Sequence, residues 1–121
     1  MNKLILFLLL LNFAAQAQEK IKWPGHKKAV IVLTYDDGMQ SQLDIAVPQL
    51  DSAHLKATFF LTGEINSITI PKWRALSKRG YELANHTIYH PCASGNDNPV
   101  VSDNYTVHGI ISEIEIMNHL L

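Results

Sequence analysis

The chain has 121 residues, 47% of them hydrophobic, with 10 lysines and arginines against 11 aspartates and glutamates. This composition is typical of a globular protein with one domain at most, and it excludes a disordered, collagen-like or coiled-coil chain. The formal net charge of -1 offers no basic surface to DNA, RNA or anionic lipid, so we expect no nucleic-acid partner. The single cysteine, Cys92, cannot form an intramolecular disulfide.

The N-terminus has the pattern of an export signal. Lys3 precedes an apolar run of about ten residues, 4–13, which ends at the small-x-small sequence 15–17. We interpret residues 1–17 as a signal peptide and 18–121 as the exported part, secreted or periplasmic. A membrane anchor is the alternative, but a span needs roughly 20 apolar residues and Gln16 and Gln18 come too early. We therefore expect no membrane association after signal removal.

The first half of the exported part predicts strand, helix and strand. Residues 29–33 are a continuous apolar, β-branched run, which suits a strand buried on both faces. Residues 41–52 place apolar side chains at helical spacing, with Pro48 as a kink or an early stop. A second strand is expected over residues 56–61.

The next segment predicts another helix and strand. Pro71 is expected to open a helix and Gly80 to cap its C-terminus, with Trp73 in the core. A third strand over residues 81–85 then leads to His86. Alternating strands and helices indicate βαβ units and a parallel sheet or barrel, an α/β fold.

The last segment is a loop followed by a helix. Residues 91–107 are rich in turn formers, which indicates a surface loop. Ser112 with Glu115 has the spacing of a capping box and predicts a helix that begins there. That helix would carry an apolar stripe: Ile111, Ile114, Met117, Leu120 and Leu121.

Polar residues follow the first and third predicted strands. Asp36, Asp37 and Gly38 come directly after the first strand, at the sheet edge where α/β proteins bind ligands. Neighbouring side chains on extended backbone point in opposite directions, so we expect the two aspartates to have different roles. The alternative is a solvated Asp-Gly turn.

His86 and His90 follow the third strand at i and i+4, a spacing that places both imidazoles on one face of a helical turn, where they can reach one cation. Two imidazoles and one carboxylate make a three-ligand site with open positions for water, which suits catalysis. Alternatively, the two histidines are unrelated, one packed in the core and the other exposed.

These segments resemble the motifs of a known family, the polysaccharide deacetylases of carbohydrate esterase family four, also called the NodB-homology family. Residues 34–38, TYDDG, resemble its first motif, and His86-Thr87-x-x-His90 its second. Residues 57–63, ATFFLTG, look like the strand between them. Tyr35 is the one departure, because the family usually has phenylalanine there. The resemblance spans about residues 28–91.

The resemblance implies the role of each site residue. Asp36 would be the catalytic base, and Asp37, His86 and His90 would hold a divalent metal, with zinc favoured. Such a metal polarises the acetyl carbonyl and lowers the pKa of its water from about 16 toward about 7. Thr87 would brace the loop by hydrogen bonding, and Asn85 would support a ligand histidine; plain loop capping is the alternative for both. Cys92 is expected to be a part-buried thiol and not a ligand.

The family's later motifs, Arg-x-Pro, an Asp/Trp segment and Leu-x-x-His, do not occur in the sequence after His90. The family fold resembles a distorted (β/α) barrel of about twice this length, so we expect residues 18–121 to form its first half, the N-terminal part of a deacetylase-like domain. Half a barrel would leave the apolar stripe uncovered, which predicts oligomers or aggregates.

The resulting expectation is a metal-dependent hydrolase that removes N- or O-linked acetyl groups from an acetylated polysaccharide, with this chain alone an incomplete enzyme. A non-catalytic metal- or glycan-binding fragment is one alternative. An amidohydrolase that acts on a non-carbohydrate C–N bond is the other.

Overall fold

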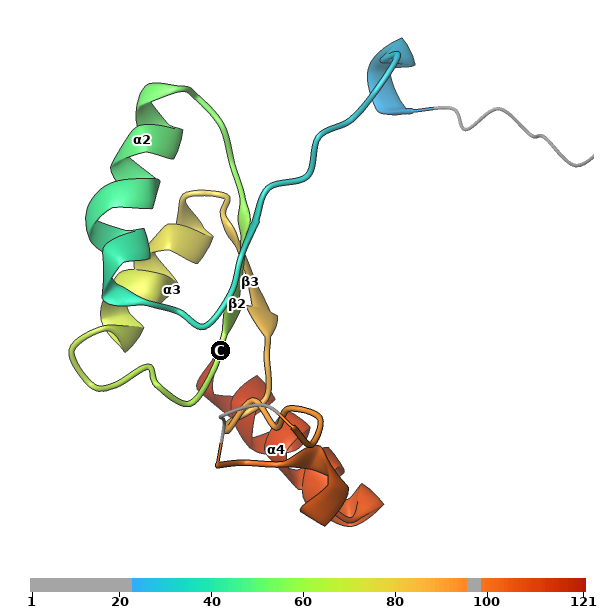
Figure 1. Ribbon diagram of the computed structural model, residues 1–121. Helices are drawn as coiled ribbons and strands as arrows, with labels where there is room; N and C mark the ends of the chain where they lie inside the picture. Colours follow the sequence, from blue (N-terminus) through green and yellow to red (C-terminus); the bar gives the residue numbers. More distant parts are fainter. Residues whose placement is uncertain (1–22, 96–98) are drawn as a thin grey trace, which may run out of the picture. The chain divides into compact units, whose positions relative to one another are not determined.

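A computed structural model describes residues 23–95 and 99–121, so the predicted signal peptide lies outside the described residues. The chain divides into two compact units, residues 1–31 and 32–121. The described part of the first unit contains a short 3-10 helix, η1 (Pro24–His26). The second unit contains the sheet (Figure 1). Among the described residues, no helix has the length and apolar character needed to cross a membrane.

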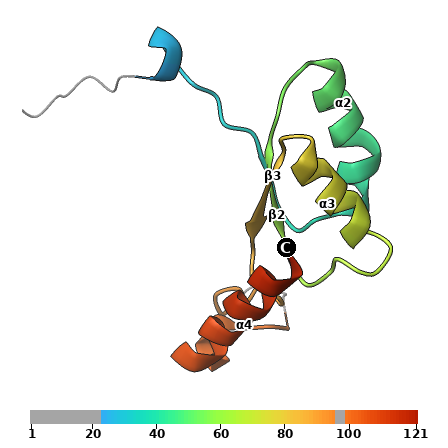
Figure 2. The ribbon, with the colours of Figure 1, turned by 180° about the vertical axis from the view of Figure 1, so that it is seen from behind.

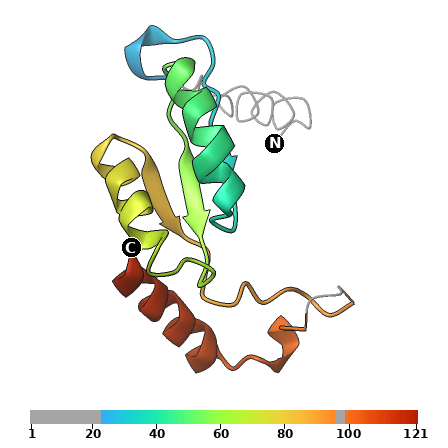
Figure 3. The same ribbon diagram turned by 90° about the vertical axis from the view of Figure 1, so that its left-hand side faces the viewer.

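The sheet has three parallel strands in the order β1 (Thr34–Tyr35), β2 (Thr58–Leu61) and β3 (Glu82–Asn85). Thr34 pairs with Thr58, and the next strand pair sets Thr58 opposite Glu82. Helices connect the strands, which confirms the α/β fold with parallel pairing. The helices α2 and α3 lie side by side on one face of the sheet, and α4 lies beyond the carboxyl ends of the strands (Figures 1, 2 and 3).

The core lies between the sheet and its two covering helices. Phe59 and Leu61 of β2 are fully buried, while Thr58 and Phe60, which alternate with them, are only partly buried. This period of two is what a strand covered on one face requires. The Phe59 ring contacts the rings of Tyr35, at 5.2 Å between centroids, and Trp73, also at 5.2 Å.

The expectation of a strand over residues 29–33 is wrong over its whole length. β1 contains only Thr34 and Tyr35, and the preceding side chains are exposed, Ile31 at 86% and Val32 at 73%. The reason is the length of the neighbouring strand. Since β2 begins at Thr58, which pairs with Thr34, residues before Leu33 have no partner in β2. An apolar run forms a buried strand only where a neighbouring strand pairs with it.

The helix expected over residues 41–52 is present, and Pro48 does not end it. A π-helical segment, η2 (Gln42–Ala46), leads directly into α2 (Val47–Ser52). The backbone N–H of Val47 donates to the carbonyl of Gln42, five residues back. A wider turn of this kind accommodates proline, which has no N–H to donate and clashes with the preceding turn of a regular α-helix.

The second helix and its cap are as expected. α3 spans Ile70–Lys78, and Trp73 in its middle is 1% exposed. Gly80 has a φ of 85° and its N–H donates to Ser77, while the N–H of Tyr81 donates to Leu76. This pair of bonds is a Schellman motif, whose left-handed position glycine occupies without strain.

The last helix begins earlier than expected. A 3-10 turn, η3 (Ser102–Asn104), precedes α4 (Val107–Leu120), and Thr106 caps the helix by accepting a hydrogen bond from the N–H of Gly109. The predicted start at Ser112 is wrong because Thr106 already supplies the cap. Met117 is fully buried, but Ile111 and Ile114 are 46% and 40% exposed, so the stripe meets the core only toward its C-terminal end.

Candidate metal centre

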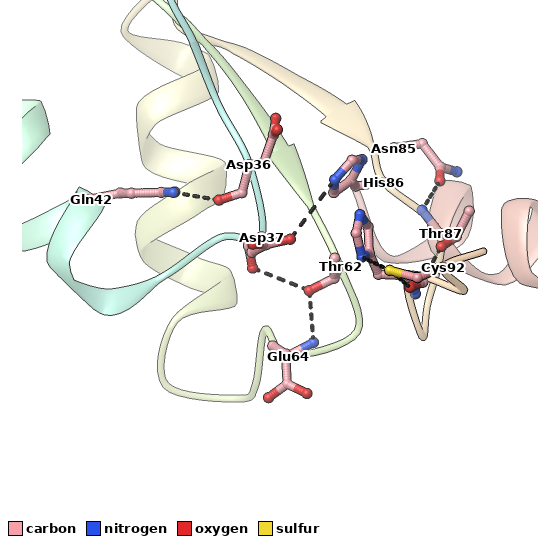
Figure 4. A network of polar contacts seen from close by, with 10 residues as sticks. Asp36, Asp37, Gln42, Thr62, Glu64, Asn85, His86, Thr87 and Cys92 are labelled. Atoms are coloured by element: carbon pink, nitrogen blue, oxygen red, sulfur yellow. Dashed lines mark hydrogen bonds and ion pairs between the residues drawn. The ribbon is translucent and has the colours of Figure 1, made fainter. Parts of the chain in front are cut away.

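Residues at the ends of all three strands converge at one edge of the sheet (Figure 4). Asp37 follows β1, Thr62 follows β2 and His86 follows β3. The N–H of His86 donates to the carbonyl of Leu61 at 3.0 Å, which extends the β2–β3 pairing by one residue. The Thr62 hydroxyl donates to the backbone carbonyl of Asp37 at 3.1 Å. Because β1 and β3 both pair with β2, the hydrogen bonds at the end of β2 place the residues that follow β1 and β3 at the same edge of the sheet.

The three predicted ligands lie together. One donor atom each from Asp37, His86 and His90 falls within 4.8 Å of the others. The distance from Asp37 Oδ1 to His86 Nε2 is 3.8 Å, and the two imidazole centroids are 4.4 Å apart. Donors about 2.0–2.2 Å from one tetrahedral zinc lie about 3.4 Å apart, so small side-chain rotations complete the set.

The donor set and its exposure fit a metal with open positions. Two imidazole nitrogens and one carboxylate oxygen form a three-ligand set of the catalytic zinc type. The side chains of Asp37 and His86 are 50% and 25% exposed, so water or a substrate can reach the cluster. A hollow of 380 Å³ adjoins it, lined by Asp37, Thr62, Glu64, Ile88, Tyr89, His90, Pro99 and Val100.

Asp36 lies outside this cluster. Its side chain is exposed, and its carboxylate points in a different direction from that of Asp37 (Figure 4). Its backbone carbonyl accepts a hydrogen bond from the buried amide of Gln42 at 2.5 Å. The two aspartates therefore occupy different environments, as expected. The reason is not the alternation of side chains along extended backbone, because β1 ends at Tyr35 and Asp37 has a left-handed φ of 74°.

The backbone at the site has unusual conformations. Asp37, Thr87 and His90 have φ values of 74°, 63° and 48°, in the left-handed region that non-glycine residues rarely adopt, β-branched ones least of all. Such residues cost about 1–3 kcal/mol each and persist only where the surroundings fix them.

Side chains within the histidine loop supply part of that support. The Thr87 hydroxyl accepts a hydrogen bond from the N–H of His90 at 3.0 Å, which confirms the bracing role expected for Thr87. Asn85 Oδ1 accepts from the N–H of Thr87 at 2.8 Å. Asn85 thus caps the loop, and its prediction as a partner of a ligand histidine is wrong because its amide group bonds α4 instead.

Gly63 permits the close approach of the loop to β2. Its N–H donates to the carbonyl of Ile88 at 2.9 Å. A Cβ at this position would lie 2.8 Å from that oxygen and 2.9 Å from Ile88 Cγ2. Glycine is therefore required here for space.

Glu113 of the C-terminal segment was missed by sequence reasoning. Glu113 of α4 is 6% exposed, and its Oε2 accepts a hydrogen bond from the N–H of Tyr89 at 3.1 Å. A hydrogen bond to Glu113 also raises the pKa of Tyr105 to about 12. Glu113 belongs to no short motif, and no local pattern distinguishes it from an exposed helical glutamate such as Glu115.

Cys92 is part-buried, as expected, and lies beside one of the ligands. Its Sγ is 3.6 Å from His90 Nδ1 and donates to the carbonyl of His90 at 3.5 Å. The thiol does not belong to the three-residue cluster found among the described residues.

Comparisons with known proteins agree with this arrangement. The family model described as polysaccharide deacetylase matches residues 24–121. The peptidoglycan-N-acetylglucosamine deacetylase of Bacillus cereus is 35% identical over 97 residues, which cover 78% of this chain and 33% of that protein. The bifunctional xylanase/deacetylase of Pseudobutyrivibrio xylanivorans is 40% identical over 62 residues, which cover 50% of this chain and 10% of that protein.

The chain thus spans about a third of the length of the first relative and about a tenth of the second. No solved structure matches it. Since the family match covers nearly all of the described residues, including all three strands and the cluster at their ends, the chain belongs to the polysaccharide deacetylase family.

Proposed function

We propose that this chain carries the metal site and the catalytic base of a hydrolase that removes acetyl groups from an acetylated polysaccharide. The observation that supports this most directly is the convergence of Asp37, His86 and His90, with donor atoms within 4.8 Å of one another beside a hollow. The names of the two relatives, one of which acts on peptidoglycan N-acetylglucosamine, support an acetylated glycan as the substrate class.

In this proposal, Asp37, His86 and His90 hold a divalent metal, with zinc favoured by the two imidazoles and one carboxylate. When bound, the metal supplies Lewis-acid polarisation of the acetyl carbonyl and of the attacking water. The hollow beside the cluster would admit the acetylated sugar, with the exposed Tyr89 side chain at its edge.

Asp36 is proposed as the general base. Its carboxylate lies apart from the three ligand side chains, so it can accept a proton from water without coordinating the metal. The buried Gln42 amide holds its backbone carbonyl, which restricts where the carboxylate can reach. The proposal further places the protein outside the cytoplasm, with residues 1–17 as the signal peptide.

Zinc titration of the 121-residue chain tests the ligand assignment. His86→Ala should weaken zinc binding strongly, because it removes one of three donors, whereas His119→Ala, an exposed histidine of α4, should not. Binding by the wild type should also weaken in acid, since imidazole ligates only when it is deprotonated. Equal zinc affinity in the wild type and His86→Ala would remove His86 from the site.

A second experiment separates the aspartates. In a full-length version of the enzyme, which also carries the family's later motifs, Asp37→Asn should lower both zinc content and acetate release, and Asp36→Asn should abolish acetate release with zinc content retained. Asp103→Asn, an exposed aspartate of η3, is the matched control. Suitable substrates are N-acetylglucosamine oligomers and acetylated xylan. Zinc binding without acetate release from either substrate would favour a metal- or glycan-binding module over a hydrolase.

A further inference from the structure

A buried carboxylate lies behind the loop that carries the two histidines. Glu113 is 6% exposed, and no salt bridge found among residues 23–95 and 99–121 involves it. Burying a carboxylate without a cation is costly unless hydrogen bonds satisfy its oxygens. The groups that Glu113 accepts from are therefore informative.

Its partners belong to the site loop and to the segment that leads into α4. Oε2 accepts from the backbone N–H of Tyr89 at 3.1 Å, across 24 residues of sequence. The Tyr105 hydroxyl is hydrogen-bonded to the same carboxylate. Tyr89 immediately precedes His90, so the carboxylate acts on the backbone one residue from a proposed metal ligand.

The decisive feature is that the C=O and the N–H of one peptide group both form hydrogen bonds to other parts of the chain. The Ile88 carbonyl accepts from the N–H of Gly63 at 2.9 Å, and the Tyr89 N–H, in the same peptide unit, donates to Glu113. This peptide lies midway between His86 and His90. Its two hydrogen bonds fix its plane between the end of β2 and the helix α4.

The helix that carries Glu113 is itself anchored to the sheet. The amide group of Asn85, at the end of β3, donates to the Ile114 carbonyl at 2.8 Å and to Asn118 Oδ1 at 2.7 Å. Met117, one turn after Glu113, is fully buried in the core. Glu113 therefore lies on a helix, α4, whose position is fixed by its contacts with the sheet and the core.

We propose that Glu113 is a positioning residue for the histidine loop: by clamping the Ile88–Tyr89 peptide against Gly63, it holds His86 and His90 in register with Asp37. This inference rests on the proposed metal-binding function. Thr87 and His90 keep their left-handed conformations because the peptide between them is held from outside the loop.

Zinc affinity of the 121-residue chain and its variants tests this role. Glu113→Ala removes the acceptor and should weaken zinc binding about tenfold, the lower end of the effect of losing an outer-shell partner. Glu113→Gln keeps an oxygen for the Tyr89 N–H and offers an N–H to the Tyr105 oxygen, so it should restore affinity close to that of the wild type. Glu115→Ala, on an exposed position of the same helix, is the matched control and should bind as the wild type does.

Two further measurements report on the loop itself. The d–d spectrum of the cobalt(II)-loaded chain should change in Glu113→Ala and not in Glu113→Gln. Hydrogen exchange of the Tyr89 amide, measured without metal, should be faster in Glu113→Ala than in the wild type.

Wild-type zinc affinity in Glu113→Ala would overturn the proposal, and so would equally weak binding by Glu113→Gln and Glu113→Ala. If Glu113→Ala does not melt cooperatively, Glu113→Asp decides, because it withdraws the carboxylate by one methylene: weakened zinc binding supports the proposal and unchanged binding overturns it. If the wild type binds no zinc, the proposed function fails, whereas the Tyr89 amide still tests the clamp.

Discussion

A methyl group at position 63 would collide with the histidine loop. In Gly63→Ala, the new Cβ would lie 2.8 Å from the Ile88 carbonyl oxygen and 2.9 Å from Ile88 Cγ2. Relief requires the loop to move, because a backbone atom cannot rotate away. The movement would lengthen the hydrogen bond from the Gly63 N–H, now 2.9 Å.

The expected magnitude follows from three opposing effects. Overpacking costs about 1–3 kcal/mol, and a lost hydrogen bond costs about 0.5–1.5 kcal/mol. Alanine restricts the unfolded chain more than glycine, which returns about 0.4–1 kcal/mol. The net effect is a destabilisation of about 0.5–4 kcal/mol, or a melting temperature lower by at least about 2 °C, together with weaker zinc binding.

Gly109→Ala is the matched control for this prediction. Gly109 lies in the first turn of α4, where a Cβ would make only ordinary contacts at 3.5 Å, so the substitution should be neutral or stabilising. Thermal melts followed by circular dichroism, with zinc titration of both variants, measure the difference. A Gly63→Ala chain that melts at or above the wild type and binds zinc equally well would refute the close-approach argument.

Three other substitutions give sharp expectations. Hydrogen bonding by Arg79 lowers the pKa of Asp51 below 3.8. The stabilisation that the ionised Asp51 carboxylate provides is therefore complete above about pH 4 and is lost in more acidic solution. Melting curves of the wild type and Asp51→Asn should converge in acid, and a difference that does not depend on pH would contradict this. The hydrogen bond to Glu113 raises the pKa of Tyr105 to about 12, so its contribution is present below pH about 10 and is lost as pH rises toward 12. Burial raises the pKa of Tyr81 as well, so Tyr105→Phe should reduce the amplitude of the late phase of the phenolate absorbance titration by one tyrosine, and an unchanged amplitude would contradict this. Phe59→Ala should cost about 3–5 kcal/mol in urea denaturation, because Phe59 is fully buried, and a loss below about 1 kcal/mol would contradict its place in the core.

Much of the site could be predicted because its signals are local. Apolar runs that end in polar residues mark strand ends, and carboxyl ends of parallel strands share one edge of a sheet. Asp37 and His86 follow such strands. The helical turn expected from His86 to His90 is wrong, because these residues form a non-helical loop in which Thr87 and His90 have left-handed φ values. The convergence of Asp37, His86 and His90 within 4.8 Å agrees with the sequence prediction. Gly80 was predictable in the same way, since a helix C-cap needs a left-handed residue.

The features that escaped prediction depend on distant parts of the chain. Residues before Leu33 form no strand because β2 begins only at Thr58, and no pattern within 29–33 contains that information. Glu113 is buried because Tyr89, 24 residues earlier, donates to it. The helix start was also predicted wrongly: the spacing of Ser112 and Glu115 indicated a start at Ser112, whereas Thr106 caps the helix.

The support of the proposed metal site has a common pattern. Several hydrogen bonds hold the loops through a backbone atom of a proposed ligand or of a residue within two positions of one. Examples are Thr62 to the Asp37 carbonyl, Gly63 to the Ile88 carbonyl, Tyr89 N–H to Glu113 and His90 N–H to Thr87. Left-handed backbone at Asp37 and His90 is strained, so these bonds offset a cost that exists before any metal arrives. Because the backbone is already fixed, cation binding needs to order only the side-chain torsions, which lowers its entropic cost. Substitutions that loosen a backbone anchor should therefore weaken metal binding even though every ligand remains, and removal of an exposed carboxylate such as Glu115 should not.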